Sequence, residues 1–444
     1  MFRKTKKSRD PGWLLFLIAI YFNAITVCRN ILFFMGYSAP LREISQVSGV
    51  MVTILLFCAV AAVARRGVFG AVYMRAHGTL VMAWIIFCAG FSVFGYFNEN
   101  EISQIGREAC VFTSFGAMLV LLGQPGWWDR LCKHLVYIGI GAAILVAIYA
   151  DTPNIEVTSD SINYDPSALL SSRRVNSLGF MLNALLDVAP LVAVTYYRHA
   201  KLRWVGVLGL VLGMMSYIYT IIIFQFRGAV FSFAVLIMMN MLISARRRQV
   251  AQMLRIAIVT VGLIGAVLYV SRWEEFSQLQ ERFRGTDTKE ASEGIMSSRL
   301  WEARALVRDL GTQEYFTGRG LGGTYNAFEV FEIESSARWP TVHFGILVFM
   351  LKGGILLLAI YILLMVRSAT SALRHTFLGY EAEPIAVYLP VVLAGSFLLP
   401  FPLTMDNLFT WIPIAACFSI LGRRPGLPEA APELRPSAAQ PIRP

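Results

Sequence analysis

The stretch HFGILVFMLKGGILLLAIYILLMV, residues 343–366, carries a single charged side chain, Lys352. A run of this length and apolarity is typical of a helix that spans a lipid bilayer, because the hydrocarbon core requires about 20 apolar residues. Similar runs, separated by short polar segments, recur along most of the chain. The repeated blocks predict an all-α, polytopic integral membrane protein.

The composition supports this prediction. Of the 444 residues, 56% are apolar and 15% are charged, and the mean hydropathy is +0.59. Water-soluble domains contain about 25% charged residues. These values exclude a protein with one water-soluble core, and they also exclude a disordered chain.

We expect about twelve transmembrane helices. The predicted spans are residues 13–35, 44–64, 78–97, 105–123, 133–150, 175–196, 203–224, 227–244, 253–271, 341–366, 384–401 and 406–422. If the N-terminus is cytoplasmic, every short loop on that side is basic, whereas the outer segment FNENEIS has no lysine or arginine. The positive-inside rule therefore places both termini in the cytoplasm.

The formal net charge of +11 is explained by this asymmetry, so we expect a lipid bilayer but no nucleic acid as a partner. The predicted organisation is a cytoplasmic N-terminus (1–12), nine transmembrane helices (13–271), a periplasmic loop (272–340), three further transmembrane helices (341–422) and a disordered cytoplasmic tail (423–444). A loop as long as 272–340 is usually functional or partly structured, and we expect it to be partly helical.

Cationic side chains gather on the predicted outer face. Arg227 opens the eighth predicted helix, Arg173 and Arg174 precede the sixth, and His343 lies where the long loop meets the tenth. An intramembrane or interfacial charge is a candidate functional group. Snorkelling to the interface is an alternative explanation for the arginines, and His343 is also compatible with an interfacial residue that has no catalytic role.

The long loop contains two notable segments. In SSRLWEARALVRDL (297–310), Leu300, Ala303, Val307 and Leu310 recur at helical spacing, which predicts an amphipathic helix. Its arginines, which lie off this apolar stripe, are Arg299, Arg304 and Arg308. The glycines of TGRGLGGTYNAF (317–328) permit a tight turn or close approach to a ligand, although the segment is not a P-loop.

Outward-facing arginines favour a phosphate-bearing substrate, since guanidinium binds phosphate oxygens through two parallel hydrogen bonds. No ATP is present outside a cytoplasmic membrane, so the donor would be a lipid-linked pyrophosphate. The predicted outer face has no cluster of metal-ligating residues, and we therefore expect metal-independent transfer without a cofactor, in which arginines stabilise the leaving group.

The stretches FRGAVFSF (226–233), SSRLWEARAL (297–306), GRGLGG (318–323) and HFGILVFMLKGGILLLAIYIL (343–363) resemble the bacterial O-antigen ligase and O-antigen polymerase superfamily. SSRRVNSLGFMLNALLDVAPLVAV (171–194) also resembles the stretch before an inner helix of that family. The resemblance covers roughly residues 170–365. In this sequence Phe344 follows the histidine where the family often has asparagine, and Lys352 stands where an acidic residue is common.

The resemblance implies glycosyl transfer from undecaprenyl pyrophosphate at the periplasmic face of the bacterial inner membrane. The acceptor would be lipid A–core in a ligase, or a second lipid-linked glycan in an O-antigen or exopolysaccharide polymerase. Arg227 and Arg299 would hold the pyrophosphate, and His343 would act on the acceptor or stabilise the leaving group. Arg174 would support them, and Arg173, Arg304 and Arg319 are further candidates for substrate binding.

Two other classes remain open. Twelve helices with both termini inside also fit a transporter or flippase of a lipid-linked or small solute, although no similarity between the two halves is visible. A non-catalytic membrane scaffold predicts instead that Arg227, Arg299 and His343 do not converge.

Overall fold

The computed structural model describes residues 10–34, 41–65, 71–124, 127–149, 303–326, 338–339 and 346–377, together with the single positions 262, 265, 412 and 415. This part of the chain is mostly helical. Its complete helices are α1 Pro11–Phe34, α2 Leu41–Arg65, α3 Ala71–Phe97, α4 Ile102–Leu122, α5 Trp127–Tyr149, α12 Thr312–Thr317 and α14 Leu347–Phe377. Two short strands, β1 Tyr325–Asn326 and β2 Arg338–Trp339, pair in the antiparallel direction.

The helical class predicted from the sequence is confirmed for the described residues. The first five predicted spans overlap α1 to α5, and the span predicted at 341–366 corresponds to α14, which starts at Leu347 and continues to Phe377. Two described helices, Ile102–Leu122 and Leu347–Leu364, are long and apolar enough to cross a membrane. The other six predicted spans lie outside the described residues except for a few single positions, so the number twelve stays a prediction.

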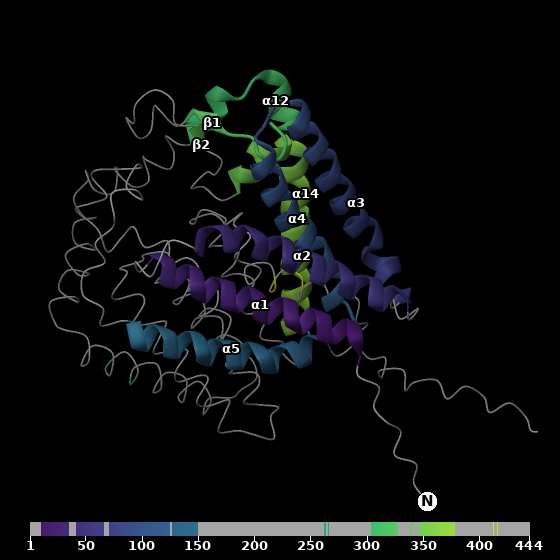
Figure 1. Ribbon diagram of the computed structural model, residues 1–444. Helices are drawn as coiled ribbons and strands as arrows, with labels where there is room; N and C mark the ends of the chain where they lie inside the picture. Colours follow the sequence, from purple (N-terminus) through teal and green to yellow (C-terminus); the bar gives the residue numbers. More distant parts are fainter. Residues whose placement is uncertain are drawn as a thin grey trace, which may run out of the picture.

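Helices α4 and α14 overlap in the view of Figure 1, with α3 beside them, and these three helices extend toward α12 and the β1–β2 pair. Helices α1, α2 and α5 cross them at a steep angle in the same view. Helix α1 packs on α2, while α4 packs on both α2 and α3. Helix α4 thus contacts α2, α3 and α5, whereas α1 packs on α2 and α5, and α12 packs on α14.

The buried face of α4 shows how these contacts are made. Trp84 of α3 is fully buried, and its indole N–H donates to the carbonyl of Phe112 over 2.9 Å. Its ring also meets Phe115 edge-on, with the ring centroids 5.0 Å apart. On the α2 side, the hydroxyls of Thr53 and Ser114 lie 2.9 Å apart in a buried hydrogen bond. Aromatic packing and satisfied hydroxyl groups thus fix the positions of α2 and α3 on α4.

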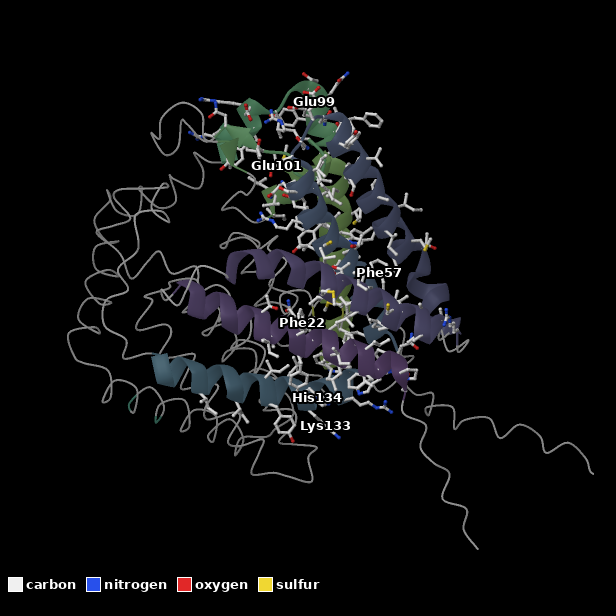
Figure 2. The ribbon with its side chains drawn as sticks, in the orientation of Figure 1. Phe22, Phe57, Glu99, Glu101, Lys133 and His134 are labelled. Carbon is white, nitrogen blue, oxygen red and sulfur yellow. The ribbon has the colours of Figure 1, made fainter. Side chains whose placement is uncertain are left out.

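Several helices expose an apolar face while burying another. On α1 the exposed residues, which recur at helical spacing, are Leu14, Ile18, Phe22 and Ile25. Side chains such as Phe22 and Phe57 lie on the middle part of the molecule, between Glu99 and Glu101 at one end and Lys133 and His134 at the other (Figure 2). Exposed apolar bands between polar ends are typical of helices in contact with lipid.

Different segments are in contact at the two ends of the described bundle. At one end, the Trp13 and Trp127 rings lie 5.3 Å apart, which brings the starts of α1 and α5 together. At the other end, the turn between α3 and α4 contacts the loop that follows α12 through hydrogen bonds from Asn98 and Asn100. The positive-inside rule assigns this turn and this loop to the same side of the membrane, and the structure brings them into contact.

Candidate functional site

The glycine-rich loop at residues 317–324 is held against α3 and α14 by backbone hydrogen bonds. Its backbone N–H groups reach α14, where Arg319 donates to the Leu351 carbonyl over 2.8 Å and Gly320 to the Lys352 carbonyl over 3.0 Å. Those carbonyls are available because α14 is interrupted at Gly353 and Gly354, which have non-helical backbone angles. A helix break therefore becomes a docking point for the loop.

Glycine is needed at this junction because the chains approach without room for a side chain. A Cβ atom at Gly95 of α3 would lie 2.2 Å from the Leu321 carbonyl oxygen, and one at Gly320 would lie 2.3 Å from the Gly95 nitrogen. Gly320 also has a positive φ of 78°. We predicted a tight turn or close approach to a ligand. The structure shows both a left-handed loop and a close approach, but the approaching group is the protein's own backbone.

Two asparagines complete the attachment from the α3–α4 turn. The Asn100 amide donates to the carbonyls of Arg319 and Leu321 over 2.8 and 2.9 Å, and the Asn98 amide donates to Arg319 over 3.1 Å. Leu321 in turn donates its backbone N–H to the Phe91 carbonyl over 3.0 Å. These hydrogen bonds satisfy backbone carbonyl and N–H groups of the loop that are not paired within a helix or strand.

Beneath the loop lies a buried ion pair. The Lys352 ammonium lies 2.6 Å from Glu108 Oε1, and both side chains are 0% exposed. Lys352 also donates to the Gly323 carbonyl over 2.7 Å, and Glu108 Oε2 accepts the Gly322 N–H over 2.7 Å. The pair therefore joins α4 to α14 and bonds to two residues of the glycine-rich loop. We call this ion pair the Glu108–Lys352 clamp.

The carboxylate of the clamp is matched to its surroundings. Besides Lys352 and the Gly322 N–H, Glu108 accepts a hydrogen bond from the Gln104 amide over 2.9 Å. All three neighbours are donors, and an ionised carboxylate is the side-chain group that offers only acceptors. Burial of two charges is costly unless the pair is well aligned and further hydrogen-bonded, and both conditions are met here.

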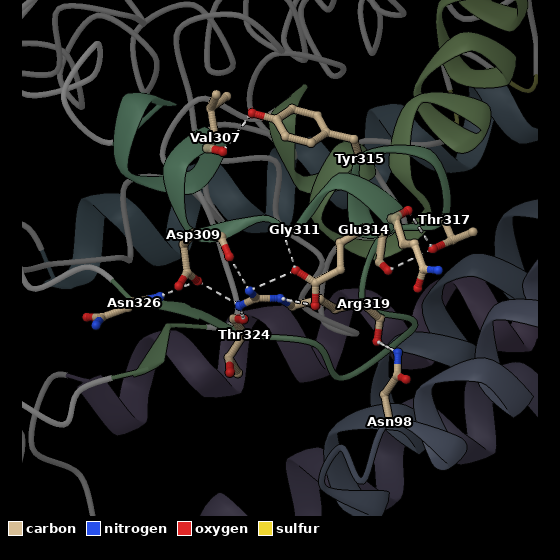
Figure 3. A network of polar contacts seen from close by, with 12 residues as sticks. Asn98, Val307, Asp309, Gly311, Glu314, Tyr315, Thr317, Arg319, Thr324 and Asn326 are labelled. Carbon is tan, nitrogen blue, oxygen red and sulfur yellow. Dashed lines mark hydrogen bonds and ion pairs between the residues drawn. The ribbon is translucent and has the colours of Figure 1, made fainter.

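Arg319 forms a second polar network on the exposed side of the loop (Figure 3). Its guanidinium donates to Asp309 Oδ2 over 2.7 Å, to Glu314 Oε1 over 3.1 Å and to Glu314 Oε2 over 3.0 Å. It also donates to the carbonyls of Thr324 and Asp309 over 2.6 and 2.5 Å. These five bonds use all five N–H groups of the arginine.

The charge of Arg319 is therefore balanced within the loop. Burial opposes the charged form, but the hydrogen bonds and charges of Glu314 and Asp309 raise the pKa of Arg319 above its ordinary value. An anionic ligand would have to displace one of these carboxylates to reach the guanidinium. The role of Arg319 in substrate binding stays a prediction, while its contacts show that it holds the loop to Asp309 and Glu314.

Arg304 lies in the helical segment 303–309, where its side chain is exposed. This segment confirms part of the amphipathic helix predicted at 297–310. The predicted apolar stripe is partly wrong, because Val307 is 39% exposed whereas Leu306 and Leu310 are buried. Leu306 and Leu310 are four positions apart and share one helical face, and this face rather than that of Val307 packs inward.

The other predicted site residues lie outside the described residues; they are Arg173, Arg174, Arg227, Arg299 and His343. Their convergence therefore stays a prediction. The described segments come near two of them in sequence, since the helical segment 303–309 begins four positions after Arg299 and α14 begins four positions after His343.

Sequence reasoning singled out Lys352 but did not find its partner. The structure pairs Lys352 with Glu108. The available signal was a glutamate inside an apolar predicted span, which requires a partner or a water-filled surrounding. Spacing along the chain gave no indication of which cation it meets.

A second polar contact lies at the opposite end of the described bundle. The Tyr21 hydroxyl lies 3.1 Å from His134 Nδ1, and the Arg130 guanidinium lies 5.8 Å from the centre of the Trp13 ring. Amphipathic aromatic side chains with nearby cations are typical of a membrane–water interface. This cluster anchors α1 and α5, and it is distant from the Glu108–Lys352 clamp.

Comparisons with protein-family models, with curated proteins and with solved structures gave no match.

Proposed function

We propose that this protein transfers a glycan from undecaprenyl pyrophosphate to an acceptor hydroxyl at the periplasmic face of a bacterial inner membrane. The proposal includes about twelve spans, cytoplasmic termini and a loop at 272–340 that covers the outer end of the helices. The acceptor is lipid A–core or a second lipid-linked glycan, as in an O-antigen ligase or a polysaccharide polymerase.

The observation that supports the proposal most directly is the contact between two stretches that carry the family resemblance. GRGLGG at 318–323 and the Lys352–Gly354 segment of α14 are joined by the backbone bonds of Arg319 and Gly320. The clamp holds these stretches together beneath the surface. A rigid, water-poor support of this kind is what a site on an outer loop needs, because catalytic groups must be held within a fraction of an ångström.

The proposed reaction needs only groups of this chain and its substrates. The acceptor hydroxyl oxygen forms a bond to the anomeric carbon while the bond from that carbon to the pyrophosphate oxygen breaks. Arg227 and Arg299 stabilise the negative charge that develops on the departing undecaprenyl pyrophosphate. His343 accepts the hydroxyl proton, or the departing pyrophosphate takes up that proton while His343 stabilises the leaving group.

The test is a transfer assay with purified protein in lipid nanodiscs and lipid-linked repeat units, with and without lipid A–core. Ladder formation without the core identifies a polymerase, and core-dependent product identifies a ligase. We expect Arg227→Lys, Arg299→Ala and His343→Ala to abolish product without loss of folded protein, since a lysine point charge does not replace the guanidinium fork.

The matched control is Arg130→Gln, which removes an arginine at the opposite end of the bundle and should leave product formation unchanged. Normal product from Arg299→Ala would remove that residue from the mechanism. Concentrative uptake of a solute into proteoliposomes, without any transfer product, would favour the transporter reading instead.

A further inference from the structure

Arg107 of α4 is a cation without a hydrogen-bond acceptor among the described residues. It lies six positions after Glu101, close to the outer end of the helix, and its side chain is partly exposed. Its Nε atom is buried and donates no hydrogen bond to any described residue. A buried N–H without an acceptor costs free energy, and more so in a charged group. An oxygen-rich anion would satisfy it.

The neighbouring carboxylate is already occupied. Glu108, the next residue, receives three hydrogen bonds from the Lys352 ammonium, the Gln104 amide and the Gly322 N–H. Lys352 is also close enough to Arg107 for the two positive charges to repel each other. Arg107, Lys352 and Glu108 together carry a formal net charge of +1 at this point of the molecule.

Apart from Glu108, which is paired with Lys352, α4 contains no acidic residue. Side chains that meet along a helix are three or four positions apart. Those positions around Arg107 are occupied by Ser103, Gln104, Cys110 and Val111. Within α4, the charge of Arg107 is therefore matched only by that of Glu108, which is already bonded to Lys352 of α14.

The location of Arg107 suits the headgroup of a lipid-anchored anion. Arg107 lies five residues inside α4, which is about 8 Å along the helix axis from its first residue. It shares a face of α4 with Val111 and Ser114, and Ser114 contacts Thr53 of α2. This face borders the clamp, which underlies the glycine loop.

We propose that Arg107 is an additional binding residue for the diphosphate group of a lipid-linked substrate at the outer end of α4, beside the Glu108–Lys352 clamp. The inference rests on the proposed function for the identity of the lipid, and it assigns a residue that neither the motifs nor the family resemblance indicated. The fork of the guanidinium supplies paired donors to two phosphate oxygens, and the isoprenoid chain remains in the bilayer.

The experiment measures binding of radiolabelled undecaprenyl pyrophosphate to the full-length protein in phosphatidylethanolamine nanodiscs. We expect Arg107→Gln to weaken binding at least about tenfold, because a charge-assisted pair of hydrogen bonds is lost. Arg107→Lys should be intermediate, since it retains the charge but not the fork. Arg130→Gln, at the other end of the bundle, should bind like the wild type.

Competition experiments distinguish a lipid-linked diphosphate from other phosphate-containing ligands. Unlabelled phosphatidylglycerol or inorganic pyrophosphate should compete at least tenfold less well than the lipid diphosphate. Equal competition by phosphatidylglycerol, or unchanged affinity in Arg107→Gln, would overturn the proposal. If Arg107→Gln does not fold, wild-type affinity in Arg107→Lys is the overturning result. Tight, Arg107-dependent binding without any glycan transfer would refute the proposed reaction but retain the binding site.

Discussion

Replacement of Glu108 by glutamine tests the Glu108–Lys352 clamp, because it changes the charge and one acceptor while almost preserving the shape. In the wild type, two carboxylate oxygens accept from the Lys352 ammonium, the Gln104 amide and the Gly322 N–H at 2.6 to 2.9 Å. A glutamine offers one acceptor oxygen and one NH₂ group. The NH₂ group must face at least one of these donors, whichever way the amide is turned.

The expected loss of stability in Glu108→Gln follows from the burial of the ion pair. Both partners of the pair are 0% exposed, so Lys352 would be left as a charge with no counter-ion and no water. Removing one partner of a buried ion pair costs about 3–5 kcal/mol of the free energy of unfolding. The loss should extend to the glycine loop, because Gly322 and Gly323 are both bonded to the pair.

The assay is reversible unfolding in mixed detergent micelles, analysed as a double-mutant cycle with Glu108→Gln, Lys352→Met and the double variant. We expect the double variant to be less destabilised than the sum of the single variants by about 2 kcal/mol, because it leaves no unpaired charge. Glu99→Gln is the control, since Glu99 is an exposed glutamate in the adjoining turn.

A charge reversal sharpens the test. In Glu108→Lys with Lys352→Glu, the new ammonium would face the Gly322 N–H and the new carboxylate would face the Gly323 carbonyl, so we expect no recovery of stability. Single variants that each cost less than about 1 kcal/mol and combine additively would refute the reasoning, because that outcome requires the two charges to be separate or hydrated.

Three further changes test the loop and the opposite end of the bundle. Arg319→Lys should cost about 2 kcal/mol and expose the loop to proteolysis, since three donors cannot replace five; unchanged cleavage would contradict the network in Figure 3. Gly95→Ala should cost about 3 kcal/mol in the same unfolding assay, because its Cβ would overlap the loop backbone, whereas Gly106→Ala in open space should be neutral or stabilise α4 by about 0.5–1 kcal/mol. Tyr21→Phe should cost about 1 kcal/mol by loss of the bond to His134, and a cost above 3 kcal/mol would indicate a different role for the hydroxyl.

The Glu108–Lys352 clamp also shows how the glycine-rich loop is kept in one position on α4 and α14. The loop has no long strand or helix at its point of contact, and it is held instead by side-chain amides, helix-end carbonyls and one buried charge pair. Polar contacts of this kind are directional, so they fix the loop in one position more strictly than apolar packing would.

The sequence by itself determined the helical class and the approximate limits of the described helices, because a segment that is apolar over about 20 residues satisfies its own backbone hydrogen bonds as a helix. It also identified the 317–328 glycines and Lys352 as unusual positions. These are local properties, and each can be read from neighbouring residues.

Only the tertiary structure decided which partner each of these positions meets. Glu108 and Lys352 are 244 positions apart, and the Asn100 amide and the Leu321 carbonyl are 221 apart. Nothing in the spacing of such residues selects the pair, since the choice depends on how α3, α4 and α14 pack and on where Gly95 and Gly353 let the chains approach. The local sequence shows only that a charged residue lies in an apolar segment. Long-range packing determines which opposite charge it meets.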